Sequence, residues 1–439
     1  MFATIRNAFK IKEIRERLLF TFAMLVVIRI GSQLPVPGVD RSFFANWFAQ
    51  QTSGAFSFFD AITGGSFLNM SILALNINPY ITSSIIMQLL TIAIPKLEEM
   101  QREGEDGRKK IVAITRYVTV LLAVIQSAAM AIGFGRQGYL TEYNAINVIM
   151  CIVALTAGSA FLMWLGEQIT EHGVGNGISI VLVINIISRL PQDLSSLYEQ
   201  FVAGKAPATA ILAALIILAI ILAMVVLVIV LNGGERRIPV QYAKKMQGRS
   251  MVGGNSSHIP LKVNTAGVIP IIFAQSLFQF PIIISSFVGY HGTGVWSEIL
   301  KYLSSQHWFK FNQTEWKYSL GMLIYIVLVV FFAYFYTSIT FNPLMVADNL
   351  KRGGGFIPGI RPGKPTSDYL SKVLNYIVFI GAVGLVIICI LPYFFGGVFG
   401  ANVSTGGTSL IIIVSVVLET VKQIESMMLV RNYKGFLDN

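Results

Sequence analysis

The side chains that could do chemistry in this sequence are not arranged as a catalytic or metal-binding site. The four histidines fall in loops or at the ends of apolar segments, at His172, His258, His291 and His307. Both cysteines, Cys151 and Cys389, lie within apolar runs and lack the spacing of metal ligands. The chain has no GxxxxGK(S/T) loop, and the run GVGNG at 173–177 lacks the last glycine of a dinucleotide fingerprint. The sequence therefore predicts no enzyme, no cofactor and no bound metal.

Amides are the polar groups that do recur within apolar segments. They lie at Asn76, Asn78, Gln88, Gln126, Asn185, Gln275 and Gln279. Three of them fall in segment 72–95 and two in segment 266–290, and these segments also carry Pro79 and Pro270. Hydrogen bonds between membrane helices contribute on the order of 1 kcal/mol each, so such groups can join two helices reversibly. The pattern fits a seam that opens, and it fits static packing equally well.

The elements that carry these groups are long apolar segments. Hydrophobic residues make up 54% of the 439 residues and charged residues only 13%, too few to cover a soluble protein of this length. The run from Ile211 to Leu231 has no polar side chain and exceeds the roughly 20 residues that cross a bilayer. We expect an all-α membrane protein with ten transmembrane helices, near residues 18–34, 72–95, 111–134, 144–166, 174–190, 207–232, 266–290, 318–341, 373–396 and 407–430.

The basic residues, which give a net charge of +11, predict the orientation of these helices. With the N-terminus inside, 25 of the 33 Lys and Arg fall on the inner side and seven on the outer, while Arg29 sits near the outer end of the first span. Because positive residues are enriched in cytoplasmic loops, both termini are predicted to be cytoplasmic. No small-residue cleavage site follows the first apolar run, which is therefore predicted to be a retained span.

Two halves of five spans, residues 1–200 and 201–439, must run in opposite directions because five is odd. Pro79 and Pro270 each fall in the second span of a half, and glycines precede the last span of each half. This recurrence favours an inverted repeat with a site near the midplane, although both residue types are common in membrane helices. A secondary transporter, the main alternative, predicts an ionisable group deep within a span. An intramembrane protease, the third alternative, predicts a catalytic dyad or metal site there, and the sequence offers neither feature.

Two inner loops, 233–265 and 342–372, are long, basic and rich in turn residues. Their basic residues are Arg236, Arg237, Lys244, Lys245, Arg249, Lys351, Arg352, Arg361 and Lys364. The bias toward positive inner loops explains their charge but not their length of about thirty residues, which is unusual for a simple connection. A channel without a nucleotide site needs an external motor, and these loops are candidate docking sites for it.

Short strings along the chain resemble, in order, one known family. They are ALNINPYI at 74–81, EGEDGRK at 103–109, MWLGEQIT at 163–170, RRIPVQYAK at 236–244, PLKVN at 260–264, ADNLK at 347–351 and PGIRPG at 358–363. Each string is weak alone, but the match is collinear and covers nearly the whole chain. The sequence thus resembles the SecY family, which supplies the central subunit of the bacterial protein-translocation channel. The resemblance implies a channel that passes unfolded polypeptides and releases transmembrane segments sideways into lipid.

An hourglass of two five-helix halves, with an apolar constriction at mid-membrane, is the fold that this resemblance implies. The positions that match the constriction are Ile77, Ile81, Ile178, Leu182, Ile272 and Ile412. Leu182 stands where isoleucine is more usual and keeps the side-chain volume. Aliphatic side chains can yield to a chain of any sequence and close behind it, and a narrow apolar neck excludes ions by dewetting.

A plug and a lateral gate are also implied by the resemblance. The plug matches segment 54–68, with Phe58, Phe59, Ile62, Gly64 and Gly65. Glycine would supply the freedom that a hinge needs, although by sequence alone the segment is an ordinary re-entrant or interfacial loop. The gate lies between spans 2 and 3 and spans 7 and 8, where the candidates are Asn76, Asn78, Gln88, Gln126, Gln275 and Gln279.

Partners follow from the resemblance in the same way. It puts the SecA ATPase and the ribosome on the two basic loops, with Arg361 as the first candidate for coupling. Contact with rRNA phosphate would be independent of sequence and would weaken with salt. SecE and SecG are the implied membrane subunits, secretory and membrane preproteins the implied substrates, and higher oligomers are left open. The implied location is the bacterial plasma membrane.

Overall fold

The structure, a computed structural model of the chain, describes residues 6–434 except for 7, 40–59, 61–62, 137, 139, 141, 205–206, 243–244, 248–249, 253–255, 289–293, 305–307, 310–315 and 400–406. Within this part, ten long helices each overlap one predicted span. They are α2 Lys12–Gly31, α5 Asn78–Ala93, α7 Glu105–Arg136, α8 Ala145–His172, α9 Gly177–Phe201, α10 Pro207–Gly233, α11 Ile269–Val288, α13 Leu320–Thr340, α15 Lys364–Phe399 and α16 Gly407–Lys434.

Length and apolarity alone qualify six of the described helices as membrane spans: α7, α8, α9, α10, α13 and α15. A seventh qualifies if α5 and α6 (Pro95–Arg102), which meet at 105°, count as one broken span. Pro95 explains the break, because proline lacks the N–H of a continuing helix and favours an extended residue before it, here Ile94. The protein is therefore mostly helical and crosses the membrane several times, as predicted.

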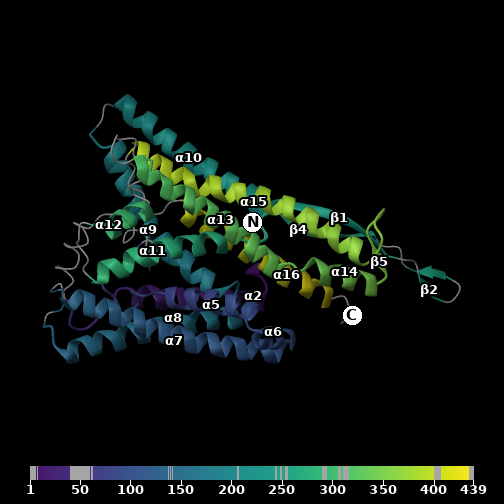
Figure 1. The fold of residues 1–439 in the computed structure, drawn as a ribbon, viewed down its shortest axis with the longest axis horizontal. Helices are drawn as coiled ribbons and strands as arrows, with labels where there is room; N and C mark the ends of the chain where they lie inside the picture. Colours follow the sequence, from purple (N-terminus) through teal and green to yellow (C-terminus); the bar gives the residue numbers. More distant parts are fainter. Residues whose placement is uncertain are drawn as a thin grey trace.

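The helices form two sides that meet along a shared interior. Figure 1 shows α5, α7 and α8 along one long side of the molecule and α10, α13 and α15 along the other. The two sides meet where α7 packs against α11 and where α9 packs against α16. Elements from the first and the second part of the chain thus line a common interface.

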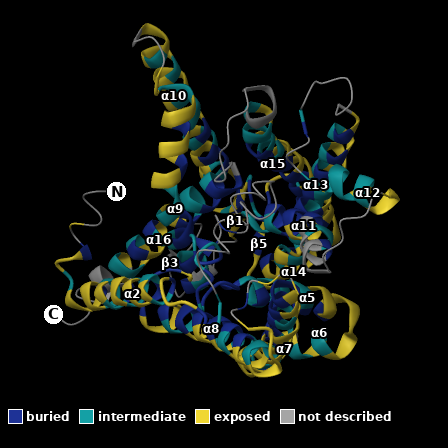
Figure 2. Ribbon diagram, turned by 90° about the vertical axis from the view of Figure 1, so that its left-hand side faces the viewer, coloured by how far each residue is buried: buried dark blue, intermediate teal, exposed yellow. Residues whose placement is uncertain are grey.

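Helix α10 shows the surface that is expected of a span in contact with lipid. Figure 2 shows it projecting from the other helices with much of its length exposed. Leu212, Leu215 and Leu222 are all more than half exposed on it. Such a surface is stable in hydrocarbon and would be costly in water.

Described parts of the two long basic loops, 233–265 and 342–372, form a small β-structure that the sequence-based prediction of an all-α protein omitted. Strands β4 (Ser256–Lys262), β1 (Glu235–Tyr242) and β5 (Gly355–Phe356) form an antiparallel sheet in that order. The hairpin of β2 (Lys245–Gln247) and β3 (Ser250–Val252) extends from it. The remaining described elements are helices α12 (Val295–Leu303) and α14 (Pro343–Arg352) and the short helix η2 (Trp316–Ser319).

Glycines bring backbones close together around helix α8. A Cβ added at Gly177, the first residue of α9, would lie 1.9 Å from the carbonyl oxygen of Gly166 in α8. A Cβ added at Gly158 of α8 would lie 2.0 Å from the carbonyl oxygen of Ile72. Small residues allow such close approach between membrane helices. Helix α8 therefore fixes the positions of both α9 and the segment that precedes α5.

Candidate functional site

Helix α9 presents one continuous face to the interior. Asn176 caps its first turn. The side-chain oxygen of Asn176 accepts hydrogen bonds from the backbone N–H groups of Ile178 and Ser179, at 3.1 and 3.3 Å. Ile178, Leu182, Asn185 and Arg189 follow at spacings of four, three and four residues. Residues three or four apart lie on the same face of a helix. This face therefore changes from aliphatic to amide to cationic along its length.

The six positions that were predicted to form a constriction all belong to one larger apolar cluster, and we call these six the aliphatic cluster. Its members are Ile77, Ile81, Ile178, Leu182, Ile272 and Ile412, from the start of α5 and from α9, α11 and α16. Ile77, Leu182 and Ile412 are buried, and the other three are partly buried. The same apolar cluster also holds Ile28 of α2, Leu165 of α8 and Tyr80 of α5. The cluster thus joins helices from both sides of the molecule.

The described residues of the segment from Asp60 to Ile77 contact the same face of α9 between Asn185 and Arg189. Gly64 lies so close to α9 that an added Cβ would be 2.7 Å from the carbonyl oxygen of Asn185, and its φ of +66° also requires glycine. The hydroxyl of Ser188 donates to the carbonyl of Gly64 at 3.3 Å. Ile77, at the end of the segment, belongs to the same apolar cluster as Leu182. These contacts therefore lie on the face of α9 beyond Leu182, toward its C-terminal end.

Asn76 makes the corner between this segment and α5. Its φ of +52° is left-handed, a conformation that asparagine tolerates better than most residues. The amide nitrogen of Asn185 donates to its side-chain oxygen at 3.2 Å, and Ser159 of α8 donates to its carbonyl at 3.0 Å. Because Asn76 bends the chain there, α5 begins at Asn78 and not near residue 72 as predicted.

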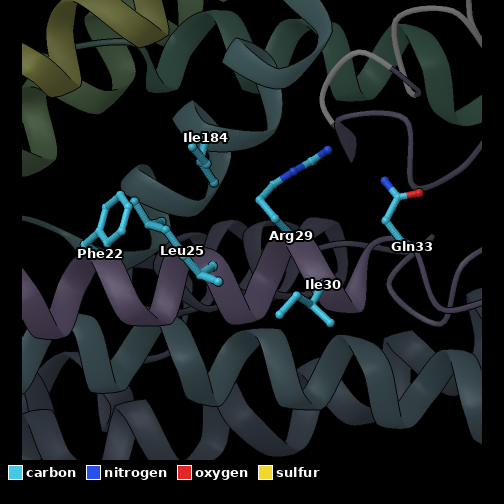
Figure 3. Close-up of a pocket in the computed structure, with 7 residues that line it drawn as sticks. Phe22, Leu25, Arg29, Ile30, Gln33 and Ile184 are labelled. Atoms are coloured by element: carbon cyan, nitrogen blue, oxygen red, sulfur yellow. The ribbon is translucent and has the colours of Figure 1, made fainter.

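A buried ion pair lies one to two turns further along α9, between Arg189 and Asp60. The carboxylate of Asp60 is fully buried, and its second oxygen accepts from the backbone N–H of Leu68 at 2.8 Å. Arg29 of α2 donates to the carbonyl of Gly64 at 3.3 Å, and Figure 3 shows its side chain reaching from α2 on the side where Ile184 of α9 lies. The pocket drawn there is a mainly apolar groove of about 480 Å³.

Sequence reasoning missed this ion pair. It predicted ionisable groups only toward the ends of spans, and Asp60 fell in a loop while Arg189 fell at the last turn of the span predicted at 174–190. Helix α9 in fact continues through Pro191 to Phe201, which places Arg189 inside a helix. A lone acidic residue in the weakly polar stretch 54–68 was the available signal, since an unpaired buried charge is costly.

The structure describes only part of the predicted plug. Gly64 and Gly65 have φ values of +66° and +83°, so both occupy conformations that favour glycine. Phe58, Phe59 and Ile62 lie outside the described residues.

The amides predicted at the lateral gate differ in their surroundings. Gln275 of α11 donates to the phenol oxygen of Tyr393 in α15 at 3.2 Å, and Asn76 pairs with α9 as described. The bond of Gln275 joins α11 to α15, and the bond of Asn76 joins the residues before α5 to α9. Neither bond crosses the contact between α7 and α11. Asn78, Gln88 and Gln126 are half-buried, and nothing is described of the side chain of Gln279.

The basic loops are brought together by strand pairing. In β1, Ile238 and Val240 point into a core that also holds Ile357 and Leu370, while Arg236 and Arg237 are exposed. Pairing of Gln241 with Phe356 joins the first loop to the second. The other described cations, Lys351, Arg352, Arg361 and Lys364, are also exposed, whereas Lys244, Arg249 and the side chain of Lys245 lie outside the described part.

Arg361 lies on an ordered turn of the second loop. The hydroxyl of Thr366 donates to its carbonyl at 2.8 Å, and α15 begins three residues after it at Lys364. This places an exposed guanidinium at the start of a helix that runs into the membrane-spanning part of the molecule.

Comparison with known proteins gives one consistent result. A family model described as SecY matches residues 71–421. The chain is 43% identical over 445 residues to the protein translocase subunit SecY of Halalkalibacterium halodurans and 42% identical over 447 residues to that of Bacillus subtilis, covering 100% of each chain in both cases. Among solved structures, a protein-conducting channel matches with a TM-score of 0.61 at 18% identity, and Sec61 in a canine ribosome–channel complex with 0.60 at 17%; both matches cover 96% of each chain.

Proposed function

The chain belongs to the SecY family, and from this we infer that its polypeptide path runs through the aliphatic cluster. SecY proteins are translocation channels and not enzymes, so the chain is a protein-conducting channel. The observation that supports the inference is that six aliphatic side chains, from α9, α11, α16 and the start of α5, belong to one apolar cluster.

The chemistry of the cluster suits a constriction for chains of any sequence. Its aliphatic groups offer no hydrogen bond or charge that would select one substrate over another. When they touch one another they leave a narrow apolar neck, in which ions would lose their hydration. A passing chain would displace them at a modest cost, because apolar contacts are non-directional.

Asp60 and residues 63–68 are proposed as the described part of the plug predicted at 54–68. Their support is their position along α9, directly beyond the aliphatic cluster. The lateral gate is proposed along the contact between α7 and α11, with α5 and α13 beside it. A nascent apolar helix would gain roughly 0.3–0.6 kcal/mol for each Leu or Ile that leaves this seam for lipid. The halves 1–200 and 201–439 are proposed as the two bodies that separate there.

The exposed sheet of the inner loops is proposed as the docking site for the motor. SecA and the ribosome are the proposed partners of this site, and the exposed Arg236, Arg361 and Lys364 are the cations that support it. SecE and SecG are proposed as companion subunits. The bacterial plasma membrane, with both termini in the cytoplasm, is the proposed location.

Ion leak through the reconstituted protein tests the proposed constriction. Replacing Ile81, Ile178 and Ile412 by serine places hydroxyls in the neck, so the substrate-free leak of halide from proteoliposomes should rise severalfold. Serine at Leu212, Leu215 and Leu222 on the exposed face of α10 is the matched control and should leave the leak unchanged. Equal leak from the cluster variant and from wild type would remove the assignment.

A further inference from the structure

We propose that the Asp60–Arg189 ion pair is an electrostatic latch that holds the plug segment against α9 and keeps the channel shut when no substrate is present. The proposal rests on the channel function and adds two positioning residues that no sequence motif identified. The side chain of Asp60 is fully buried and that of Arg189 is largely buried, with 0% and 14% of them exposed.

The latch is placed where it can act on the constriction. Arg189 lies seven residues after Leu182 on the same face of α9, a rise of about 10 Å at 1.5 Å per residue. The carboxylate that it binds belongs to the segment that ends in Ile77 of the aliphatic cluster. Separating the pair would therefore release the segment at Asp60, while its other end, Ile77, belongs to the aliphatic cluster.

Secondary contacts hold the same segment but are weaker. Ser188 and Arg29 each donate one hydrogen bond of 3.3 Å to the carbonyl of Gly64, and Asn185 donates one of 3.2 Å to the side-chain oxygen of Asn76. Such bonds to a neutral carbonyl are weaker than a hydrogen-bonded pair of opposite charges. The ion pair is thus the main polar contact that the described part of the segment makes with α9.

The setting also makes the latch reversible. A buried ion pair is strong only while water is excluded, because each separated ion is costly in a medium of low dielectric constant. When a substrate chain opens the interior, water can hydrate both charges and lower the cost of separation. The contact then favours the shut state without resisting a translocating chain.

Asp193 makes the latch asymmetric. It lies one turn after Arg189 on α9, is itself buried, and is close enough to Asp60 to act on it by repulsion. The attraction between Arg189 and Asp60 opposes this smaller repulsion. Removing the arginine should free the segment more than removing Asp60, because the two acids then repel.

Substrate-free ion leak from proteoliposomes tests the latch. We expect Asp60→Asn to raise the leak at least tenfold and Arg189→Gln to raise it further. The double variant, which has neither an unpaired buried cation nor the repulsion, should return to about the level of Asp60→Asn. Arg189→Lys keeps the charge and should leak less than Arg189→Gln.

The matched control is the ion pair of Arg116 and Glu167, which is 2.8 Å long and more exposed, with 47% of the arginine accessible. Replacing both by glutamine should leave the leak within twofold of wild type. Folding is checked by the elution volume of each detergent-purified variant, and the neutral double variant keeps the test valid if a single variant misfolds. A double variant as tight as wild type would overturn the latch. If the serine variant of the aliphatic cluster leaks in the same assay, the constriction would survive that result.

Discussion

The corner at Asn76 gives a prediction whose magnitude can be worked out from two features of the structure. The first is the left-handed φ of +52°, which costs a β-branched residue roughly 1–2 kcal/mol. The second is the hydrogen bond from Asn185, whose amide nitrogen is left unsatisfied and buried if its acceptor is removed, at about 1–3 kcal/mol. Asn76→Val loses both, so it should destabilise the protein by about 2–5 kcal/mol.

Asn76→Gly separates these two contributions. Glycine adopts the left-handed conformation without strain and loses only the side-chain hydrogen bond. We expect it to be more stable than Asn76→Val by about 1–2 kcal/mol, which is the backbone term alone. The free energy of unfolding can be measured in mixed micelles of SDS and a non-ionic detergent. Equal stabilities of the glycine and valine variants would refute the account of the corner.

A double-mutant cycle isolates the hydrogen bond. Asn185→Ala in the Asn76→Gly background removes both partners, so its effect should be smaller than in the wild-type background by about 0.5–1.5 kcal/mol. Additive effects would mean that the 3.2 Å contact contributes nothing measurable.

Two further predictions concern packing and coupling. Gly177→Ala puts a methyl group 1.9 Å from the carbonyl oxygen of Gly166 and should lower the free energy of unfolding by about 1–3 kcal/mol. The control is Gly233→Ala, whose methyl group meets nothing within 4 Å and should leave the free energy of unfolding unchanged in the same assay. Arg361→Glu should slow SecA-driven import of a preprotein into membrane vesicles severalfold. The amount of assembled protein should not fall, because the side chain of Arg361 is exposed. The control is Lys12→Glu, because the side chain of Lys12 is also exposed, at 79%. Unchanged import by Arg361→Glu would exclude it from coupling.

The helices were predictable from sequence because the bilayer imposes a length and an apolar composition on each span. The run from Ile211 to Leu231 predicts α10 almost to its ends. Local chemistry limited the prediction elsewhere. The span predicted at 174–190 ends before Pro191, whereas α9 continues through this proline to Phe201, and Asn76 delays the start of α5.

The small sheet could also have been found in the sequence. Along β1 the buried Ile238 and Val240 alternate with exposed residues, a period of two that indicates a half-buried strand. Its partner β5 is only two residues long and lies more than a hundred positions away, so its pairing is not visible in any local pattern.

The candidate site divides in a similar way. Its six aliphatic positions could be named only through the family resemblance, because an isoleucine in an apolar helix carries no local mark of a pore. The Asp60–Arg189 pair depends on a contact across 129 positions and on the continuation of α9, and neither is visible in the local sequence. The basic residues of the inner loops were visible as charge, but their common surface depends on the sheet.

Photocrosslinking of a stalled preprotein tests the central claim most directly. A photoreactive residue is placed in turn at 77, 81, 178, 182, 272 and 412, and at the exposed positions 212, 215 and 222 of α10. A chain arrested halfway through the channel should crosslink to each of the first six positions and to none of the α10 positions. Crosslinks that favour α10, or that spare the six aliphatic positions, would show that polypeptides do not pass through the aliphatic cluster.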